Sequence, residues 1–227
     1  MREIVFDTET TGLDPRSGDR MVEIGCIEMI NRIPTGETFH AYYNPQRDMP
    51  AGAEAVHGLS IAFLSDKPVF AEGADALLEF IGDDPLVAHN AHFDFGFLNS
   101  ELEKCGRNAV SLDRMVDTVA LAKKRHPGAK LSLDALCTRY GIDRSHRVKH
   151  GALLDAELLA QVYIELTGGR QIGLGLSAES PQAATGEGRH VSPARPRREP
   201  RIFAPSAEEL ARHRQFLTTI DKPLWLS

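Results

Sequence analysis

The sequence is poor in cysteine and has no long hydrophobic run. Its three cysteines, Cys26, Cys105 and Cys137, are odd in number and widely spaced, so neither a disulfide framework nor a cysteine metal site is expected. No apolar stretch approaches the roughly 18 residues of a membrane-spanning helix. The start, MREIVFDTET, reaches a charged residue too early for a signal peptide. We therefore expect a soluble, cytoplasmic protein with no membrane partner.

Basic residues are outnumbered by acidic ones, 26 to 32, and the net charge is unevenly distributed. The net charge is −6; residues 170–227 carry nine basic and six acidic side chains, a net charge of +3, which leaves −9 for residues 1–169. A protein that holds nucleic acid by its own electric field usually has a basic face. If nucleic acid is the substrate, bound divalent cations or a partner protein must neutralise its phosphates.

Composition divides the 227 residues into three parts. The first 169 contain enough hydrophobic residues for one full-sized domain with a core. Residues 170–200 are mostly Gly, Ser, Ala, Pro and Arg, which predicts a flexible linker. Apolar residues and an acid-rich helix start at Ser206 return in residues 201–227. This part is too short to fold alone, so we interpret it as a docking segment.

The hydrophobic pattern of the domain changes along the chain. It predicts three strands, at residues 3–6, 21–30 and 38–43. We expect them to form an antiparallel meander with a turn at 34–36. Afterwards two short strands alternate with helices. These strands are expected at 86–88 and 115–116, and the helices at 71–81, 93 to about 106, 118–124, 133–140 and 153–166. The order predicts an α/β fold with a mixed central sheet flanked by helices.

Two acidic residues, Asp7 and Glu9, end the first predicted strand. Side chains alternate across a strand, so both carboxylates project from the same face. Carboxylates held this close repel each other unless a cation lies between them. Oxygen ligands of this kind suit Mg²⁺ or Mn²⁺. An isolated pair would more often be a solvated strand end.

Two other carboxylates follow a histidine near a helix start. Asp94 follows the short strand at 86–88, where it could equally cap the next helix. Asp155 lies five residues after His150. On one helix these two side chains would point roughly 140° apart. They converge only if His150 lies on the loop before the helix, a bend that Gly151 makes easy.

Together these segments resemble a known family. Residues 7–13, 89–94 and 150–155 are similar, in order and separation, to the three motifs of the DEDDh (DnaQ-like) 3′→5′ exonucleases. The resemblance covers residues 2–169 and implies a ribonuclease H-like fold. It also implies four metal-binding carboxylates and a general base, all of them catalytic: Asp7, Glu9, Asp94, Asp155 and, as the base, His150.

The expected chemistry follows from these residue types. Two Mg²⁺ or Mn²⁺ ions about 4 Å apart can bind the attacking water and the leaving 3′ oxygen of one phosphate. A neutral histidine accepts the proton. The substrate would be a single-stranded or frayed 3′ end of DNA, and the product a nucleoside 5′-monophosphate.

The resemblance also implies contacts with the terminal nucleotide. These substrate-binding residues are Asp7, Thr8, Glu9, Thr10, Leu13, His57, Asn90, Phe93 and Asp155. Core packing explains Leu13 or Phe93 as well, and His57 after a turn could simply be exposed. Asp117 could orient a metal ligand or cap the following helix.

The tail resembles that of family members that proofread for a bacterial replicative polymerase. Its expected anchors on the polymerase's catalytic subunit are Ile202, Phe203, Leu210, Phe216, Leu217, Leu224 and Trp225, aromatic residues being frequent binding hot spots. A tail that docks on its own domain is the alternative. Residues 171–176, with Gln171, Leu174 and Leu176, are similar to a sliding-clamp-binding pattern; an ordinary linker is the alternative.

Other functions remain open at this point. A standalone DNA repair or RNA-trimming exonuclease would share the same motifs. A non-catalytic adaptor would bind nucleic-acid ends and recruit partners through the tail. Comparing single-stranded DNA and RNA as substrates discriminates the RNA-trimming enzyme, and a digestion assay in Mg²⁺ tests the adaptor.

Overall fold

The structure is a computed structural model that describes residues 1–145, 147, 149–168 and 204–220. The chain divides into two compact units, residues 1–176 and 177–227. No helix within the described ranges is long and apolar enough to cross a membrane. Most residues expected to bind partners lie outside the described residues, namely Gln171, Leu174, Leu176, Ile202, Phe203, Leu224 and Trp225.

The centre of the first unit is one mixed sheet with the strand order β3-β2-β1-β4-β5. Its strands are β1 (Arg2–Thr10), β2 (Met21–Ile30), β3 (Ile33–Tyr42), β4 (Leu86–Ala88) and β5 (Met115–Asp117). The first three pair antiparallel, whereas β1, β4 and β5 run parallel. The predicted meander and mixed sheet are confirmed. Strand β1 continues to Thr10, so Asp7 and Glu9 lie within the strand, near its carboxyl end.

The turn predicted at 34–36 is wrong. The β2–β3 hairpin turns at Asn31 and Arg32, whose φ angles of 52° and 65° are the left-handed values that a tight two-residue turn needs. Pro34 therefore lies inside β3, which begins at Ile33 and not at residue 38. Since β3 is an edge strand, the missing N–H of Pro34 is tolerated there.

Seven α-helices are described in the first unit. They are α1 (Ala51–His57), α2 (Ile61–Leu64), α3 (Phe70–Ile81), α4 (His92–Lys104), α5 (Thr118–Arg125), α6 (Leu133–Tyr140) and α7 (Ala152–Leu166), with 3₁₀ turns η1 (Pro15–Ser17) and η2 (Leu112–Arg114). The five predicted helices are confirmed. The sequence did not indicate α1 and α2, which are short and bury one residue each, His57 and Leu64, so they carry no apolar period.

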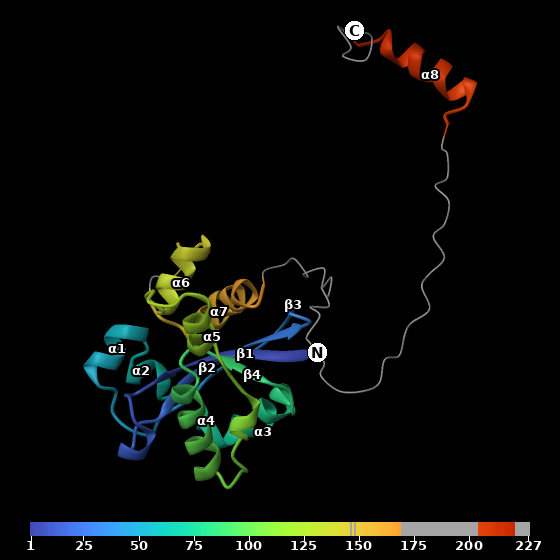
Figure 1. The fold of residues 1–227 in the computed structure, drawn as a ribbon. Coiled ribbons are helices and arrows are strands. Elements are labelled where there is room, and N and C mark those ends of the chain that lie inside the picture. The colour runs from blue at the N-terminus through green and yellow to red at the C-terminus, as the bar shows by residue number, and fades with distance from the viewer. Residues whose placement is uncertain (146, 148, 169–203, 221–227) are drawn as a thin grey trace, which may run out of the picture. The chain divides into compact units, whose positions relative to one another are not determined.

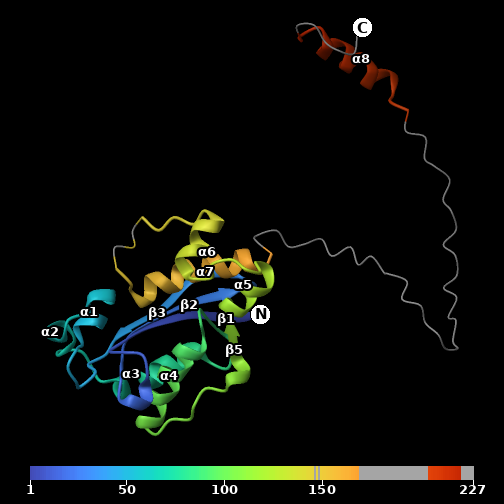
Figure 2. The same cartoon turned by 60° about the vertical axis from the view of Figure 1, so that its left-hand side comes forward.

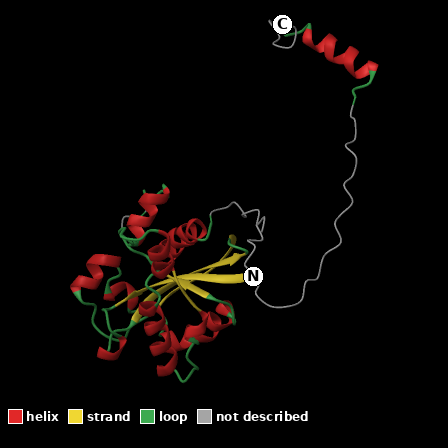
Figure 3. Ribbon diagram, in the orientation of Figure 1, coloured by secondary structure: helices red, strands yellow, loops and turns green. Residues whose placement is uncertain are grey.

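The helices cover both faces of the sheet (Figures 1–3). Alternation along β1 directs Ile4 and Phe6 to the core under α3 and α4. Val5 points to the opposite face, where α5, α6 and α7 pack. Odd-numbered residues of β1 therefore face α7, and this parity includes Asp7 and Glu9.

The described part of the second unit is α8 (Ala207–Leu217) with its flanks. The helix start expected at Ser206 is confirmed: its hydroxyl caps the helix, and Glu209 completes a capping box. Leu210 and Phe216 are exposed, whereas Leu217 is buried. A docking role for this helix stays a prediction.

Candidate active site

The first three carboxylates meet at one edge of the sheet because β1 and β4 are parallel. The carboxyl ends of parallel strands lie at the same edge, where β1 carries Asp7 and Glu9. Helix α4 begins shortly after β4 and brings Asp94 to this edge in its first turn. The Thr8 hydroxyl donates a hydrogen bond of 2.7 Å to Oδ1 of Asp94. This bond ties the end of β1 to the start of α4.

The fourth carboxylate arrives on α7 because β2 has a glycine beside Asp7. Gly25 pairs with Asp7 in the β1–β2 register. A Cβ atom at Gly25 would lie 2.3 Å from the Leu153 backbone, so only glycine lets the first turn of α7 lie this close to the sheet. Asp155, in that turn and buried, thereby reaches the acidic residues of β1.

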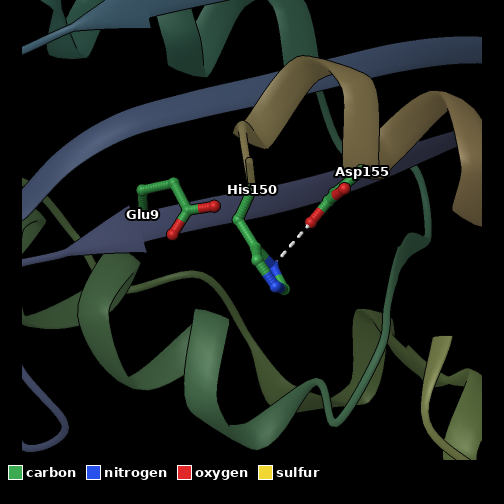
Figure 4. Close-up of side chains that lie close together, drawn as sticks. All are labelled: Glu9, His150 and Asp155. Atoms are coloured by element: carbon green, nitrogen blue, oxygen red, sulfur yellow. Dashed lines mark hydrogen bonds and ion pairs between the residues drawn. The ribbon is translucent and has the colours of Figure 1, made fainter. Parts of the chain in front are cut away.

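His150 lies on the loop before α7, as its convergence with Asp155 requires. The helix begins at Ala152, and the His150 backbone N–H donates to the Val56 carbonyl of α1 at 3.3 Å. The His150 ring lies between the carboxylates of Glu9 and Asp155 (Figure 4). One potential ligand atom from each of these three residues lies within 4.8 Å of the other two.

The acidic residues strongly perturb one another. Burial raises the pKa of Asp7 well above its ordinary value, and the negative charges of Asp94 and Glu9 raise it further. Burial also raises the pKa of Glu9 to about 8, with added effects from Asp155 and Glu23. For Asp94, burial raises the pKa to about 7, although the Thr8 hydrogen bond opposes the shift. Burial and neighbouring negative charges thus disfavour the ionised forms of these three carboxylates.

Such a site suits a divalent cation. The donor set is oxygen-rich, and hard carboxylate ligands bind Mg²⁺ and Mn²⁺ in preference to soft metals. A cation between the carboxylates would stabilise the ionised forms of Asp7, Glu9 and Asp94, which burial and nearby negative charge disfavour. The residues present therefore fit a metal centre formed by Asp7, Glu9, Asp94 and Asp155.

The chain is similar to known proteins over most of its length. A family model described as "Exonuclease" matches residues 4–163 of the 227. The chain belongs to the exonuclease family. The resemblance inferred from the three motifs is thereby confirmed, and the protein is a metal-dependent 3′→5′ exonuclease.

Curated relatives are similar to this exonuclease along almost its whole length. The DNA polymerase III subunit epsilon of Rickettsia felis is 48% identical over 228 residues, covering 98% of both chains. The protein of the same name from Escherichia coli (strain K12) is 41% identical, covering 97% of this chain and 94% of its own. The likeness to these relatives thus continues past the residues that the family model matches.

Solved structures confirm the fold of the exonuclease. Exonuclease X in complex with 5′ overhanging duplex DNA matches with a TM-score of 0.58 and 25% identity, over 73% of this chain and 90% of its own. Exonuclease I of E. coli, in complex with a dT13 oligonucleotide, matches with a TM-score of 0.62 and 18% identity, over 73% of this chain and 40% of its own. The predicted ribonuclease H-like architecture is therefore confirmed.

Three residues expected at the terminal nucleotide lie on loops or helix starts around the carboxylates. Leu13 is 84% exposed after β1, so the alternative that it packs in the core is wrong. Asn90 adopts a left-handed φ of 62° in the turn before α4. Phe93 is half-buried and packs on Phe97, with ring centroids 5.0 Å apart, so packing explains at least part of its role.

His57, Thr10 and Asp117 have structural contacts of their own. His57 is buried at the end of α1, where Nδ1 accepts a hydrogen bond from the Leu59 N–H, so the alternative of an exposed histidine is wrong. The Thr10 hydroxyl donates to the Gly12 carbonyl at 2.6 Å. Asp117 caps α5, and the same Oδ1 accepts a hydrogen bond from the Asn90 N–H at 3.1 Å. Asp117 therefore holds the turn that leads to Asp94.

Sequence reasoning missed Arg147. Its Nε and Nη2 atoms donate to the two oxygens of Asp155 at 2.5 and 2.6 Å, and Nη1 donates to Asp134 at 2.8 Å. Its positive charge lowers the pKa of Asp7 and of Glu9. The residue lies outside the motif segments, in a polar stretch with several basic side chains, so nothing local distinguishes it.

Arg147 also contacts the histidine. Its Nη2 lies 2.7 Å from Nδ1 of His150, which in turn lies 3.1 Å from Oδ2 of Asp155. A neutral imidazole nitrogen either accepts or donates a hydrogen bond. Nδ1 therefore accepts from Arg147 or donates to Asp155, but not both at once.

Proposed function

We propose that the protein is the epsilon subunit of a bacterial DNA polymerase III, which proofreads the primer terminus. It would hydrolyse DNA from the 3′ end and release nucleoside 5′-monophosphates. The observation that carries the proposal is identity of 41% to 48% with subunits of this name over 97% to 98% of the chain. A standalone repair or RNA-trimming exonuclease would not need a likeness that extends through the tail.

In this proposal Asp7, Glu9, Asp94 and Asp155 hold two divalent ions, Mg²⁺ or Mn²⁺. The raised pKa values of Asp7, Glu9 and Asp94 support the assignment, because a bound cation stabilises the ionised carboxylates that burial and nearby negative charge disfavour. Bound ions would stabilise the negative charge that develops on the phosphate during hydrolysis. Burial and the negative charges of Asp94, Glu9 and Asp155 raise the pKa of Asp7, so its removal should be the most damaging.

His150 is the proposed general base. Its side chain is 48% exposed, so water and the substrate phosphate can reach it. A hydrogen bond from Nδ1 to Asp155 would fix the ring and leave Nε2 to accept the proton of the attacking water. The loop position next to α1 holds the histidine at the rim of the acidic cluster.

The terminal nucleotide would contact the residues around the carboxylates. The exposed Leu13 would pack against the last base, and Asn90 would hydrogen-bond the 3′ end. The remaining proposed substrate contacts are Asp7, Thr8, Glu9, Thr10, His57, Phe93 and Asp155. The hydrogen bond that Thr10 donates to the Gly12 carbonyl and the one that His57 accepts from the Leu59 N–H would hold these two side chains in fixed positions for the nucleotide.

We further infer that the tail connects the exonuclease to its partners. Residues 1–169 form the catalytic domain, 170–200 a linker and 201–227 the segment that binds the DNA polymerase III alpha subunit. The exposed Phe216 of α8 supports this role. Phe203, Leu224 and Trp225, which lie outside the described residues, are the other proposed anchors. Gln171, Leu174 and Leu176 would bind the sliding clamp. Tethering raises the local concentration of primer ends, so an acidic nuclease needs no basic groove of its own. Chromosomal replication would place the protein in the cytoplasm.

A digestion assay tests the catalytic part. The full chain, with Mg²⁺, is given 5′-labelled single-stranded DNA, a duplex with a 3′ mismatch, a matched duplex and single-stranded RNA of the same sequence. We expect stepwise shortening of the DNA from its 3′ end, fastest for single-stranded and mismatched ends, and none with Asp7→Asn. Preferential digestion of RNA would support the RNA-trimming alternative, and no digestion of any substrate would support the adaptor.

Co-purification tests the tail. Full-length and 1–169 forms are mixed with the alpha subunit, and only the full-length form should co-elute. Equal recovery of both forms would show that docking does not use residues 170–227. Deletion of residues 171–176 should weaken clamp binding in surface plasmon resonance, and unchanged binding would remove the clamp proposal.

A further inference from the structure

The guanidinium of Arg147 binds the carboxylate oxygens of Asp155, which a divalent ion would need as its ligands. Both oxygens of Asp155 accept hydrogen bonds from the guanidinium, in the forked geometry that makes arginine–carboxylate pairs strong. The side chain is only 10% exposed, so solvent screens the pair weakly. Arg147 also contacts His150, so one cation holds the carboxylate and the base together.

A neighbouring arginine shows that this arrangement is specific to one position. Arg144 pairs with Asp134 at 2.7 Å, as Arg147 does at 2.8 Å. Its side chain is 37% exposed, and its further hydrogen bond is to Thr138, away from the acidic cluster. The two arginines thus share an anchor, Asp134, but only Arg147 extends from it to Asp155 among the described contacts.

We propose that Arg147 is an internal counter-ion of the metal-free site and that a divalent ion displaces it from Asp155. The inference rests on the proposed metal-binding role of Asp155. Two cations at the same carboxylate repel each other, and both need its oxygen lone pairs, so they compete. The guanidinium can leave without entering bulk solvent alone, because Asp134 holds its other edge.

Displacement would also change the hydrogen bonding of His150. While Arg147 donates to Nδ1, that nitrogen accepts, and the ring proton is on Nε2. Once Arg147 withdraws, Nδ1–H can donate to Asp155 and Nε2 can accept a proton. Arg147 would therefore be a positioning residue that links arrival of the metal to preparation of the base.

Metal titration tests the competition directly. Mn²⁺ binding to the full chain is measured by isothermal titration calorimetry for the wild type, Arg147→Met, Arg147→Lys and the matched control Arg144→Met. We expect on the order of tenfold tighter binding for Arg147→Met, since charge-assisted hydrogen bonds to Asp155 are removed. Arg147→Lys, which keeps the charge, should lie between, and Arg144→Met should match the wild type. Unchanged or weaker binding by Arg147→Met overturns the proposal.

Thermal unfolding gives a second readout that a merely structural role would not produce. In EDTA, Arg147→Met should melt below the wild type, because Asp155 stays buried without its counter-ion. Added Mn²⁺ should raise its melting temperature by more than it raises that of the wild type. An equal increment in the two proteins overturns the competition.

If Arg147→Met fails to fold, an NMR measurement on the wild type tests the proposal. In protein with ¹⁵N-labelled arginine, the Nε resonance assigned by its absence in Arg147→Lys should shift on addition of Mg²⁺, while that of Arg144 stays in place. An unmoved Arg147 resonance overturns the inference. If the wild type binds metal and digests DNA in that case, the proposed function stands; if it binds no divalent ion, both fail.

Discussion

His150 differs from the carboxylates around it in its exposure. Its side chain is 48% exposed, whereas that of Asp155 is 4% exposed. A half-exposed ring contributes little to packing, so the fold does not depend on it. Removal of a buried carboxylate, in contrast, changes the charge balance of the whole cluster. Base and metal ligands should therefore respond differently to substitution.

We expect His150→Ala to retain metal and DNA binding but to lose turnover by about 10²- to 10⁴-fold, the usual contribution of a general base. Single-turnover hydrolysis and Mn²⁺ calorimetry measure the two properties separately. Asp7→Ala is the comparison and should lose metal binding as well. Near-normal turnover in His150→Ala would contradict its role as the base.

Thr8 supports Asp94 through a buried hydrogen bond. Thr8→Val keeps the shape of the side chain but leaves Asp94 without this donor, which should cost about 1–3 kcal/mol of unfolding free energy. Thr8→Ser retains a hydroxyl and serves as the control. Urea denaturation in EDTA measures both, and a Thr8→Val variant as stable as the wild type would show that the bond contributes nothing.

At the scale of elements, the contact of α7 with β2 determines whether the fourth carboxylate reaches the others. The backbone of Leu153 lies against Gly25, directly beside Asp7 in the sheet. Backbone atoms cannot rotate away as a side chain can. Any side chain at residue 25 must therefore shift the start of α7, and Asp155 and the His150 loop with it.

Gly25→Ala should cost about 1–3 kcal/mol by overpacking and reduce turnover more than its effect on stability would explain. Gly52→Ala in α1 is the matched control, because an added Cβ there meets nothing within 4 Å. Denaturation and the digestion assay are run on both variants. Full activity of Gly25→Ala would show that the helix start need not lie so close to the sheet.

At the scale of the whole molecule, the buried acids make stability depend on pH and metal. Folding raises the pKa of Glu9 from 4.5 to about 8 and that of Asp94 from 3.8 to about 7. The folded state therefore binds more protons than the unfolded state in this range. Its stability from these groups is greatest below their ordinary pKa values and falls as pH rises to the raised ones.

In EDTA, we expect the melting temperature to fall by several degrees between pH 5 and pH 8. Mg²⁺ should stabilise the protein more at pH 8 than at pH 6, because ions bind the deprotonated carboxylates. Differential scanning calorimetry across pH, with and without Mg²⁺, measures this. A metal-free melting temperature that rises toward pH 8 would contradict the raised pKa values of Glu9 and Asp94.

Local patterns in the sequence were sufficient for most elements and for the acidic residues. The strand at 21–30, the helix at 133–140 and the position of His150 before α7 follow from apolar periods and from Gly151, which involve neighbouring residues only. The shared face of Asp7 and Glu9 follows from strand alternation alone.

Only the tertiary structure decided the contacts between distant segments. Gly25 looks like any strand glycine until α7 packs on it, and His57 is buried although its short helix carries no apolar period. Arg147 and Arg144 are indistinguishable in sequence, yet one reaches Asp155. Periodicity reports the face on which a side chain lies, whereas its partner depends on how elements far apart in the chain approach each other in space.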